Sequence, residues 1–320
     1  MILVDEPRWP AHGTLWAHLV SDLSLDELHA FAARVGLPRR AFDLDHYDVA
    51  ADRLDELVRA GARQVTGREL VSRLAASGLR VRGRDRPAAR RADLARRWDM
   101  LLPGTAQIGA ELLERWHEPH RAYHGPGHLA HVLRSVQVAA GGAPVPREVL
   151  LALWFHDAVH HGGVARPDGR VPDGAGRREA RGAVVGTDEE RSADLAARLL
   201  APTVAAGLLT PDDVAEVRRL VLLTATHDPE PADRSGALVC DADLAVLGGA
   251  PESYARYVAQ VRAEYAHVPD AAFRAGRAAV LRGLLALPRL FTTPEARRRW
   301  EDAARANLAT ELGRLAPPVP

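Results

Sequence analysis

The sequence predicts two domains of different fold class, a small α/β domain over residues 1–80 and an all-α domain over residues 92–316. The chain has 320 residues, a comfortable length for two hydrophobic cores. Up to residue 80, short β-like runs alternate with helical segments, as they do in small α/β units. From residue 92 onward the apolar spacing is helical and no strand pattern occurs.

The first domain is expected to begin with strands at residues 2–4 and 16–20. Ser24 then provides an N-cap with Glu27 three residues later, and Gly36 ends the helix that follows. The remaining predicted elements are helices at 54–60 and 68–76, a strand at 64–66 and an irregular stretch at 41–49.

Several segments of this domain match one known pattern: residues 4–9, 16–22, 25–29, 46–48 and 61–70. Through these segments the domain resembles a family that is catalogued only as a domain of unknown function. The resemblance covers nearly all of residues 2–80 and implies no activity. Five side chains in this stretch either line a ligand pocket or serve as capping and packing residues: Asp5, Trp9, His18, His46 and Asp48.

Residues 81–91 are predicted to be an arginine-rich linker between the two domains. Gly83 and Pro87 interrupt the segment, which has no apolar period. A nucleic-acid-binding arm is the alternative, but the run is short and Asp85 breaks its charge, which favours a solvated linker.

The second domain is expected to contain about ten helices, several of which start at good caps such as Thr105, Thr210 and Thr293. The predicted helices are residues 92–102, 105–118, 126–138, 149–160, 189–200, 211–226, 237–247, 252–267, 271–286 and 293–312. Residues 161–187 have almost no apolar content and are expected to form a flexible insertion, either a lid or a disordered segment.

The composition argues against several classes of function. The formal net charge is zero, which disfavours nucleic acid as a partner. The single cysteine, Cys240, excludes an internal disulfide and a cysteine-based zinc site, and every basic residue is arginine. The N-terminus lacks a signal-peptide pattern, and no run approaches the ~18 apolar residues of a membrane span, so a cytoplasmic protein is expected.

The most informative stretch is an apolar run at 149–155 that leads directly into His156 and Asp157. A core seldom tolerates adjacent ionisable groups without a partner, and a divalent metal is the usual partner of imidazole and carboxylate together. Eight of the fourteen histidines lie between His117 and His161, a concentration that further favours a metal site.

Three other segments carry matching residue types. A helix start at 123–131 places His124 just before the helix, with His128 and His131 one turn apart on it. Acidic residues open the helix near residue 188, and Asp241 and Asp243 interrupt an apolar helix, where carboxylates are costly unless they are paired or ligated.

In this order, histidine, His-Asp and Asp on successive helices resemble the HD superfamily of metal-dependent phosphohydrolases, over residues ~95–315. The closest subgroup is a bacterial family known mainly as predicted phosphohydrolases. The matching segments are residues 123–128, 152–159, 189–193, 241–248, 261–265, 276–277 and 304–308. The resemblance implies an all-α HD-type domain.

The resemblance also implies roles for individual residues. The metal ligands would be His128, His156, Asp157 and Asp243, with Asp157 able to bridge two ions and so to take part in catalysis. His124 matches a histidine that protonates the leaving oxygen. The residues proposed for a second metal or for holding its water are Glu189, His227, His160 and Asp241. Asp243 is preferred to Asp241 because it directly precedes leucine.

Two departures from the subgroup make the substrate pocket less predictable than the metal site. His160 stands where tyrosine is usual, and Asp188 stands where asparagine is typical, next to a long insertion. Arg121 and Arg191 are weak candidates for binding non-transferred phosphate, since an arginine is more often a solvated surface residue.

The favoured hypothesis is hydrolysis of a phosphate ester or nucleotide by a water activated by one or two divalent ions, which Mn, Fe, Zn, Ni or Mg would supply. The alternative is a non-catalytic nucleotide- and metal-binding sensor with the first domain as its output. A nuclease is a third option, disfavoured by the zero net charge and the lack of an aromatic stacking platform. The expected partner is therefore a small phosphorylated molecule or nucleotide.

Overall fold

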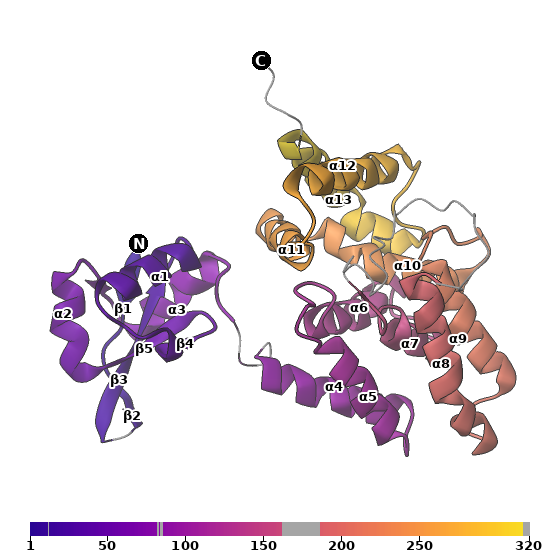
Figure 1. Ribbon diagram of the computed structural model, residues 1–320, viewed down its shortest axis with the longest axis horizontal. Coiled ribbons are helices and arrows are strands. Elements are labelled where there is room, and N and C mark those ends of the chain that lie inside the picture. The colour runs from indigo at the N-terminus through magenta and orange to yellow at the C-terminus, as the bar shows by residue number, and fades with distance from the viewer. Residues whose placement is uncertain (12, 82, 84–85, 162–185, 316–320) are drawn as a thin grey trace. The chain divides into compact units, whose positions relative to one another are not determined.

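The computed structural model describes residues 1–11, 13–81, 83, 86–161 and 186–315. It divides into two compact units, Met1–Ala89 and Arg90–Pro320 (Figure 1). An α/β region is thus followed by a helical region. None of the helices in the described ranges combines the length and the apolarity needed to cross a bilayer.

The first unit is built on one six-stranded sheet in the order β4-β5-β3-β1-β6, with β2 paired to β3. Only β1 and β6 pair in parallel, and the other pairs are antiparallel. The strands are β1 (Ile2–Val4), β2 (Trp9–Ala11), β3 (Thr14–Ser21), β4 (Phe42–Asp43), β5 (His46–Ala50) and β6 (Arg63–Gln64).

The helices of this unit cover both faces of the sheet. They are α1 (Leu25–Arg34), α2 (Leu54–Arg59) and α3 (Gly67–Ala76), and Ser24 and Thr66 cap α1 and α3 through their side chains. Because successive strand residues point to opposite faces, Leu19 packs in the core with α1, whereas Val20 packs in a second core with Leu70 and Leu74 of α3.

Strand β5 is the main difference from the sequence expectation for this unit, which treated residues 41–49 as irregular. Its burial alternates regularly, with Tyr47 and Val49 in the core and His46 and Asp48 on the other face. The strand was missed because His46 and Asp48 made the segment look polar. They occupy the less buried positions of an alternating strand pattern. A second difference is that the next helix, α4 (Pro87–Leu101), begins at Pro87, so helical structure starts inside the segment expected to be a linker.

The second unit is helical throughout its described residues. Its elements are α4 (Pro87–Leu101), α5 (Ala106–Trp116), α6 (Pro126–Ala139), α7 (Arg147–Phe155), α8 (Asp188–Ala205), α9 (Pro211–Leu223), α10 (Arg234–Leu244), the 3-10 turn η4 (Ala245–Gly248), α11 (Pro251–Glu264), α12 (Asp270–Ala286) and α13 (Pro294–Leu315). Capping boxes at Thr187 and Thr210 start α8 and α9, which lie side by side (Figure 1).

Helix α7 passes through the core of this unit and packs against α6, α9 and α10. The sequence prediction extended it to residue 160, but the helix ends at Phe155, with His156 as its C-cap. Trp154 and Phe155 are fully buried at this end, so the polar residues that follow emerge from the centre of the core. Most of the predicted insertion at 161–187, namely residues 162–185, lies outside the residues that the structure describes.

Candidate metal centre

Four predicted residues meet where three elements of the helical unit converge. His128 lies in the first turn of α6, whose start is set by Pro126 at the first helical position. His156 and Asp157 follow the end of α7, and Asp243 lies near the end of α10.

Their ligand atoms lie close together. His128 Nε2 is 3.0 Å from His156 Nε2 and 3.1 Å from Asp243 Oδ1. Asp157 Oδ2 is 3.2 Å from His156 Nε2 and 3.5 Å from His128 Nε2. Both imidazoles are buried, with side chains no more than 1 % exposed, whereas the carboxylates are 17–20 % exposed. The cluster therefore has its imidazoles in the interior of the helical unit and its carboxylates toward solvent.

The ionisation of the four groups is coupled. Burial lowers the pKa of His156, but Asp157 and Asp243 outweigh it and raise that pKa well above its usual value. Burial likewise raises the pKa of both carboxyl groups, but the nearby His156 reverses the effect and holds them well below their usual range. Each charge is tolerated in the core only because its opposite lies within hydrogen-bonding reach.

Hydrogen bonds orient two of these side chains. His156 Nδ1 lies 2.9 Å from the carbonyl oxygen of Leu153, to which it donates, so Nε2 is the ring nitrogen that faces the cluster. His227 Nε2 lies 2.9 Å from the second oxygen of Asp243. His227 thus contacts the cluster through Asp243.

The two aspartates of α10 have different surroundings. Asp241 is buried and accepts hydrogen bonds from the backbone N–H groups of Thr292 and Thr293, each at 2.7 Å, just before α13. The side chain of Asp241 therefore anchors the segment that leads into α13, whereas Asp243 faces the histidines. The structure does not bring Asp241 into the cluster.

A second group of ionisable residues adjoins the first. Glu264, at the end of α11, has a fully buried side chain whose Oε1 lies 2.5 Å from His124 Nδ1 and 2.8 Å from His160 Nε2. Its Oε2 accepts from the backbone N–H groups of Tyr123 and His124 at 2.9 and 3.1 Å. The ring centroids of His124 and His128 are 5.6 Å apart, so the two groups are neighbours.

Sequence reasoning assigned no role to Glu264, although the segment 261–265 was part of the HD resemblance. In the sequence, Glu264 stands near the end of an amphipathic helix, where a glutamate is usually solvated. The histidines that pair with it are more than a hundred residues away in the chain. Only packing of α11 against the loop before α6 reveals the contact.

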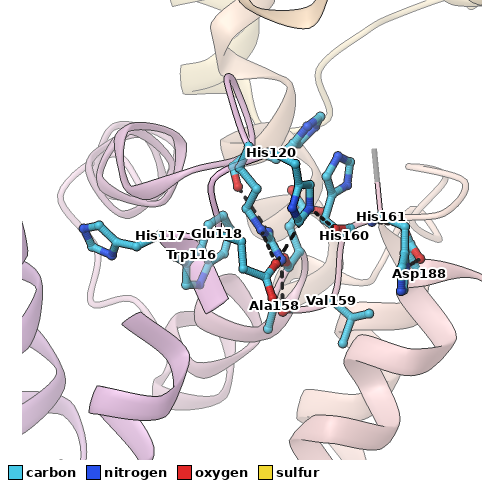
Figure 2. Close-up of polar contacts among 12 residues, drawn as sticks. Trp116, His117, Glu118, His120, Ala158, Val159, His160, His161 and Asp188 are labelled. Atoms are coloured by element: carbon cyan, nitrogen blue, oxygen red, sulfur yellow. Dashed lines mark hydrogen bonds and ion pairs between the residues drawn. The ribbon is translucent and has the colours of Figure 1, made fainter. Parts of the chain in front are cut away.

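Arg121 has a structural position. Its side chain is fully buried, and its guanidinium donates to the carbonyl oxygens of His124, Asp157 and Ala158. Figure 2 shows this region, where His120 also reaches the backbone oxygen of His160 and His161 faces Asp188. All these donors are engaged within the protein, so Arg121 braces the turn that carries Asp157.

The remaining predicted residues lie at the edge of the site. The guanidinium Nη1 of Arg191, on α8, lies 3.3 Å from His161 Nε2. Glu189 lies half-buried in the first turn of α8, and within the described residues no bond joins it to the four-residue cluster. His131, one turn after His128, bonds Ser135 and lies outside the cluster; burial lowers its pKa to about 4.

A family described as "Protein of unknown function (DUF4031)" matches residues 2–77. This match lies within the first unit and confirms the resemblance of that unit to a family of unknown function. Comparison with curated proteins found no match, and comparison with solved structures found none either.

Proposed function

We propose that the helical unit is an HD-type metal-dependent phosphohydrolase that acts on a phosphate ester or nucleotide. The observation that carries the proposal is the convergence of His128, His156, Asp157 and Asp243 on one buried point from three separate elements. The HD resemblance of residues ~95–315, noted from sequence motifs, supports the same reading.

The donor set suits a divalent ion. Two imidazole nitrogens 3.0 Å apart with carboxylate oxygens beside them match the nitrogen and oxygen ligands that Mn, Fe, Zn and Ni accept. His128 Nδ1 is buried and has no hydrogen-bond partner within the described residues, so the polar contacts of this ring are all made by Nε2, the nitrogen that faces the cluster. When bound, such an ion would supply Lewis acidity and lower the pKa of a coordinated water.

The neighbouring group provides a proton donor. Because His124 Nδ1 is engaged with Glu264, the proton available for transfer is at Nε2. Burial lowers the pKa of His124, and Glu264 partly offsets that effect. A phosphate anion beside the ring would raise the pKa of His124 from this lowered value, which favours the protonated form that a general acid requires.

The proposal is tested with Asp157→Asn and Asp243→Asn, which keep side-chain size while removing a ligand charge. We expect both variants to lose bound metal and at least about 10²-fold in kcat/KM on a panel of phosphomonoesters, phosphodiesters and nucleotides with Mn²⁺. Asp194→Asn, at an exposed position of α8 paired with Arg218, is the matched control.

Full metal-dependent activity in Asp157→Asn would show that the site is wrongly assigned. Tight nucleotide binding by the wild-type protein in the presence of metal, with no product after long incubation, would instead favour the sensor hypothesis. Far-UV circular dichroism of the variants should match that of the wild-type protein, which shows that a loss of activity does not come from unfolding.

A further inference from the structure

The first unit contains its own cluster of metal-ligating side chains, His18, His46 and Asp48. The antiparallel register of β3 and β5 pairs His18 directly with Asp48. His46 lies two residues before Asp48 and therefore on the same face of the sheet. Sheet register thus brings together residues that are about thirty positions apart in sequence, in a unit whose matching family has no assigned function.

The spacing of these groups suits a small ion. One ligand atom from each residue lies within 4.8 Å of the others, and His46 Nε2 is 3.4 Å from Asp48 Oδ1. A tetrahedral zinc ion with bonds of 2.0–2.1 Å requires neighbouring ligand atoms roughly 3.3 Å apart. The His46–Asp48 pair already has this separation, and the partly exposed His18 ring offers its ligand atom within 4.8 Å of both.

Two buried carboxylates orient the histidine rings. Asp5 Oδ2 lies 3.0 Å from His18 Nδ1, and Asp45 Oδ1 lies 2.6 Å from His46 Nδ1. Both aspartates are at most 6 % exposed. A carboxylate that accepts from Nδ1 leaves the Nε2 lone pair directed away, which is the arrangement found behind histidine ligands of metals.

A purely structural role for Asp5 and Asp45 explains their backbone contacts but not their contacts with the histidine rings. Asp5 Oδ1 accepts from the His18 backbone and Asp45 Oδ2 accepts from the backbone of Val81, so each has a packing function as well. That function requires neither imidazole. Within the described residues, His18 Nε2 has no hydrogen-bond partner, and His46 Nε2 faces only Asp48.

A pocket of about 290 Å³ opens beside the cluster. It is lined by His18, His46 and Asp45, by Leu70 and Leu74 of α3, and by Arg80 and Arg86, of which Arg86 is ion-paired with Asp43. An ion held by three protein ligands keeps further positions open, and the guanidinium of Arg80 suits a negatively charged occupant.

We propose that His18, His46 and Asp48 bind a divalent transition-metal ion, with Asp5 and Asp45 orienting the rings, and that a small anion binds beside the ion in the pocket. Trp9 packs edge-on against His18 and shields one side of the cluster. This inference is independent of the function proposed for the helical unit.

The test uses the full chain carrying Asp157→Asn and Asp243→Asn, which removes two ligands of the other cluster. We expect this background to bind about one equivalent of Zn²⁺ by calorimetry and metal analysis, and to give the visible absorption bands of a low-symmetry Co²⁺ site. Adding His46→Gln should abolish both signals. His29→Gln is the matched control, because His29 bonds Tyr47 on the opposite face of the same sheet.

Equal Zn²⁺ binding with and without His46→Gln would overturn the proposal. Asp48→Asn provides a second variant that should fold, since that side chain is 47 % exposed, and it should weaken Zn²⁺ binding at least about tenfold. If the helical unit binds no metal, wild type holds one equivalent rather than two, and the His46→Gln result is unaffected.

The anion is tested with inorganic phosphate. Phosphate should shift the Co²⁺ absorption bands of the background protein, and Arg80→Gln should weaken that shift at least several-fold. Bands that do not respond to phosphate would overturn the anion part of the proposal while leaving the metal site.

Discussion

Replacing Glu264 with glutamine tests the arrangement around His124 most directly. The Glu264 side chain is 0 % exposed, and its oxygens accept four hydrogen bonds, two from histidine rings and two from backbone N–H groups. Burial opposes ionisation, but the hydrogen bonds from His124 and His160 outweigh it and hold the pKa of Glu264 far below its usual value. Glutamine therefore removes a charge that is present at neutral pH.

The size of the effect follows from those four bonds. A hydrogen bond to a charged group contributes about 1.5–3 kcal/mol, against about 0.5–1.5 kcal/mol for a neutral one. The glutamine side chain also has an NH₂ group in place of one carboxylate oxygen. That group cannot accept hydrogen bonds from the surrounding N–H donors, so some of them lose their partner. We expect Glu264→Gln to lower the free energy of unfolding by about 2–4 kcal/mol at pH 7. The loss should shrink below pH 4.5, because protonation of the unfolded carboxyl removes this stabilisation as the pH falls.

Urea unfolding followed by far-UV circular dichroism measures this loss, since the helical unit dominates that signal. Glu252→Gln, at an exposed position in the first turn of the same helix, is the control and should change stability by less than about 0.5 kcal/mol. Loss of the Glu264 charge should also lower the pKa of His124, so the alkaline limb of the kcat/KM profile should move to lower pH. Equal urea midpoints for the two variants, with an unchanged pH profile, would refute the reasoning.

Burial lowers the pKa of His131 to about 4, below its usual 6.5, so between these values the unfolded chain binds more protons and the free energy of unfolding falls with falling pH. His131→Gln should reduce this pH-dependent loss of unfolding free energy by up to roughly 3 kcal/mol, an upper bound because the ring is partly exposed. Unfolding curves of both proteins at pH 7 and pH 4.5 measure the effect. A Cβ at Gly248 would lie 2.4 Å from Trp300 Cβ and 2.7 Å from its Cα, so Gly248→Ala should cost at least about 1–3 kcal/mol in chemical denaturation. Gly276→Ala on α12, with no atom within 4 Å, should instead gain up to about 1 kcal/mol, and a similar loss in both variants would contradict the packing argument.

Local features of the chain were predictable where a few neighbouring residues decide the structure. The capping side chains Ser24 and Thr210 start helices in the structure, because an N-cap bonds backbone groups only three residues away. The division into an α/β region and a helical region follows from the repeat of apolar residues, which each element carries in its own sequence. The end of α7 was predicted five residues too late, since residues 156–160 contain no glycine or proline that would mark the end of a helix.

The placement of side chains from distant segments depended on tertiary structure. Asp241 and Asp243 are two positions apart, so they point about 200° apart around α10, and helix packing alone decides which one meets the histidines. Sheet register similarly decides that His18 lies opposite Asp48.

By itself, the sequence determined the two-part architecture, most of the helices and the concentration of histidine and aspartate around residue 156, because these depend on contacts within a few residues. Only the tertiary structure decided that Glu264 holds His124, that Arg121 is a buried brace, and that His18, His46 and Asp48 lie together in the α/β unit. These contacts join residues tens to more than a hundred positions apart, and their formation depends on how whole helices and strands pack to bury apolar surface.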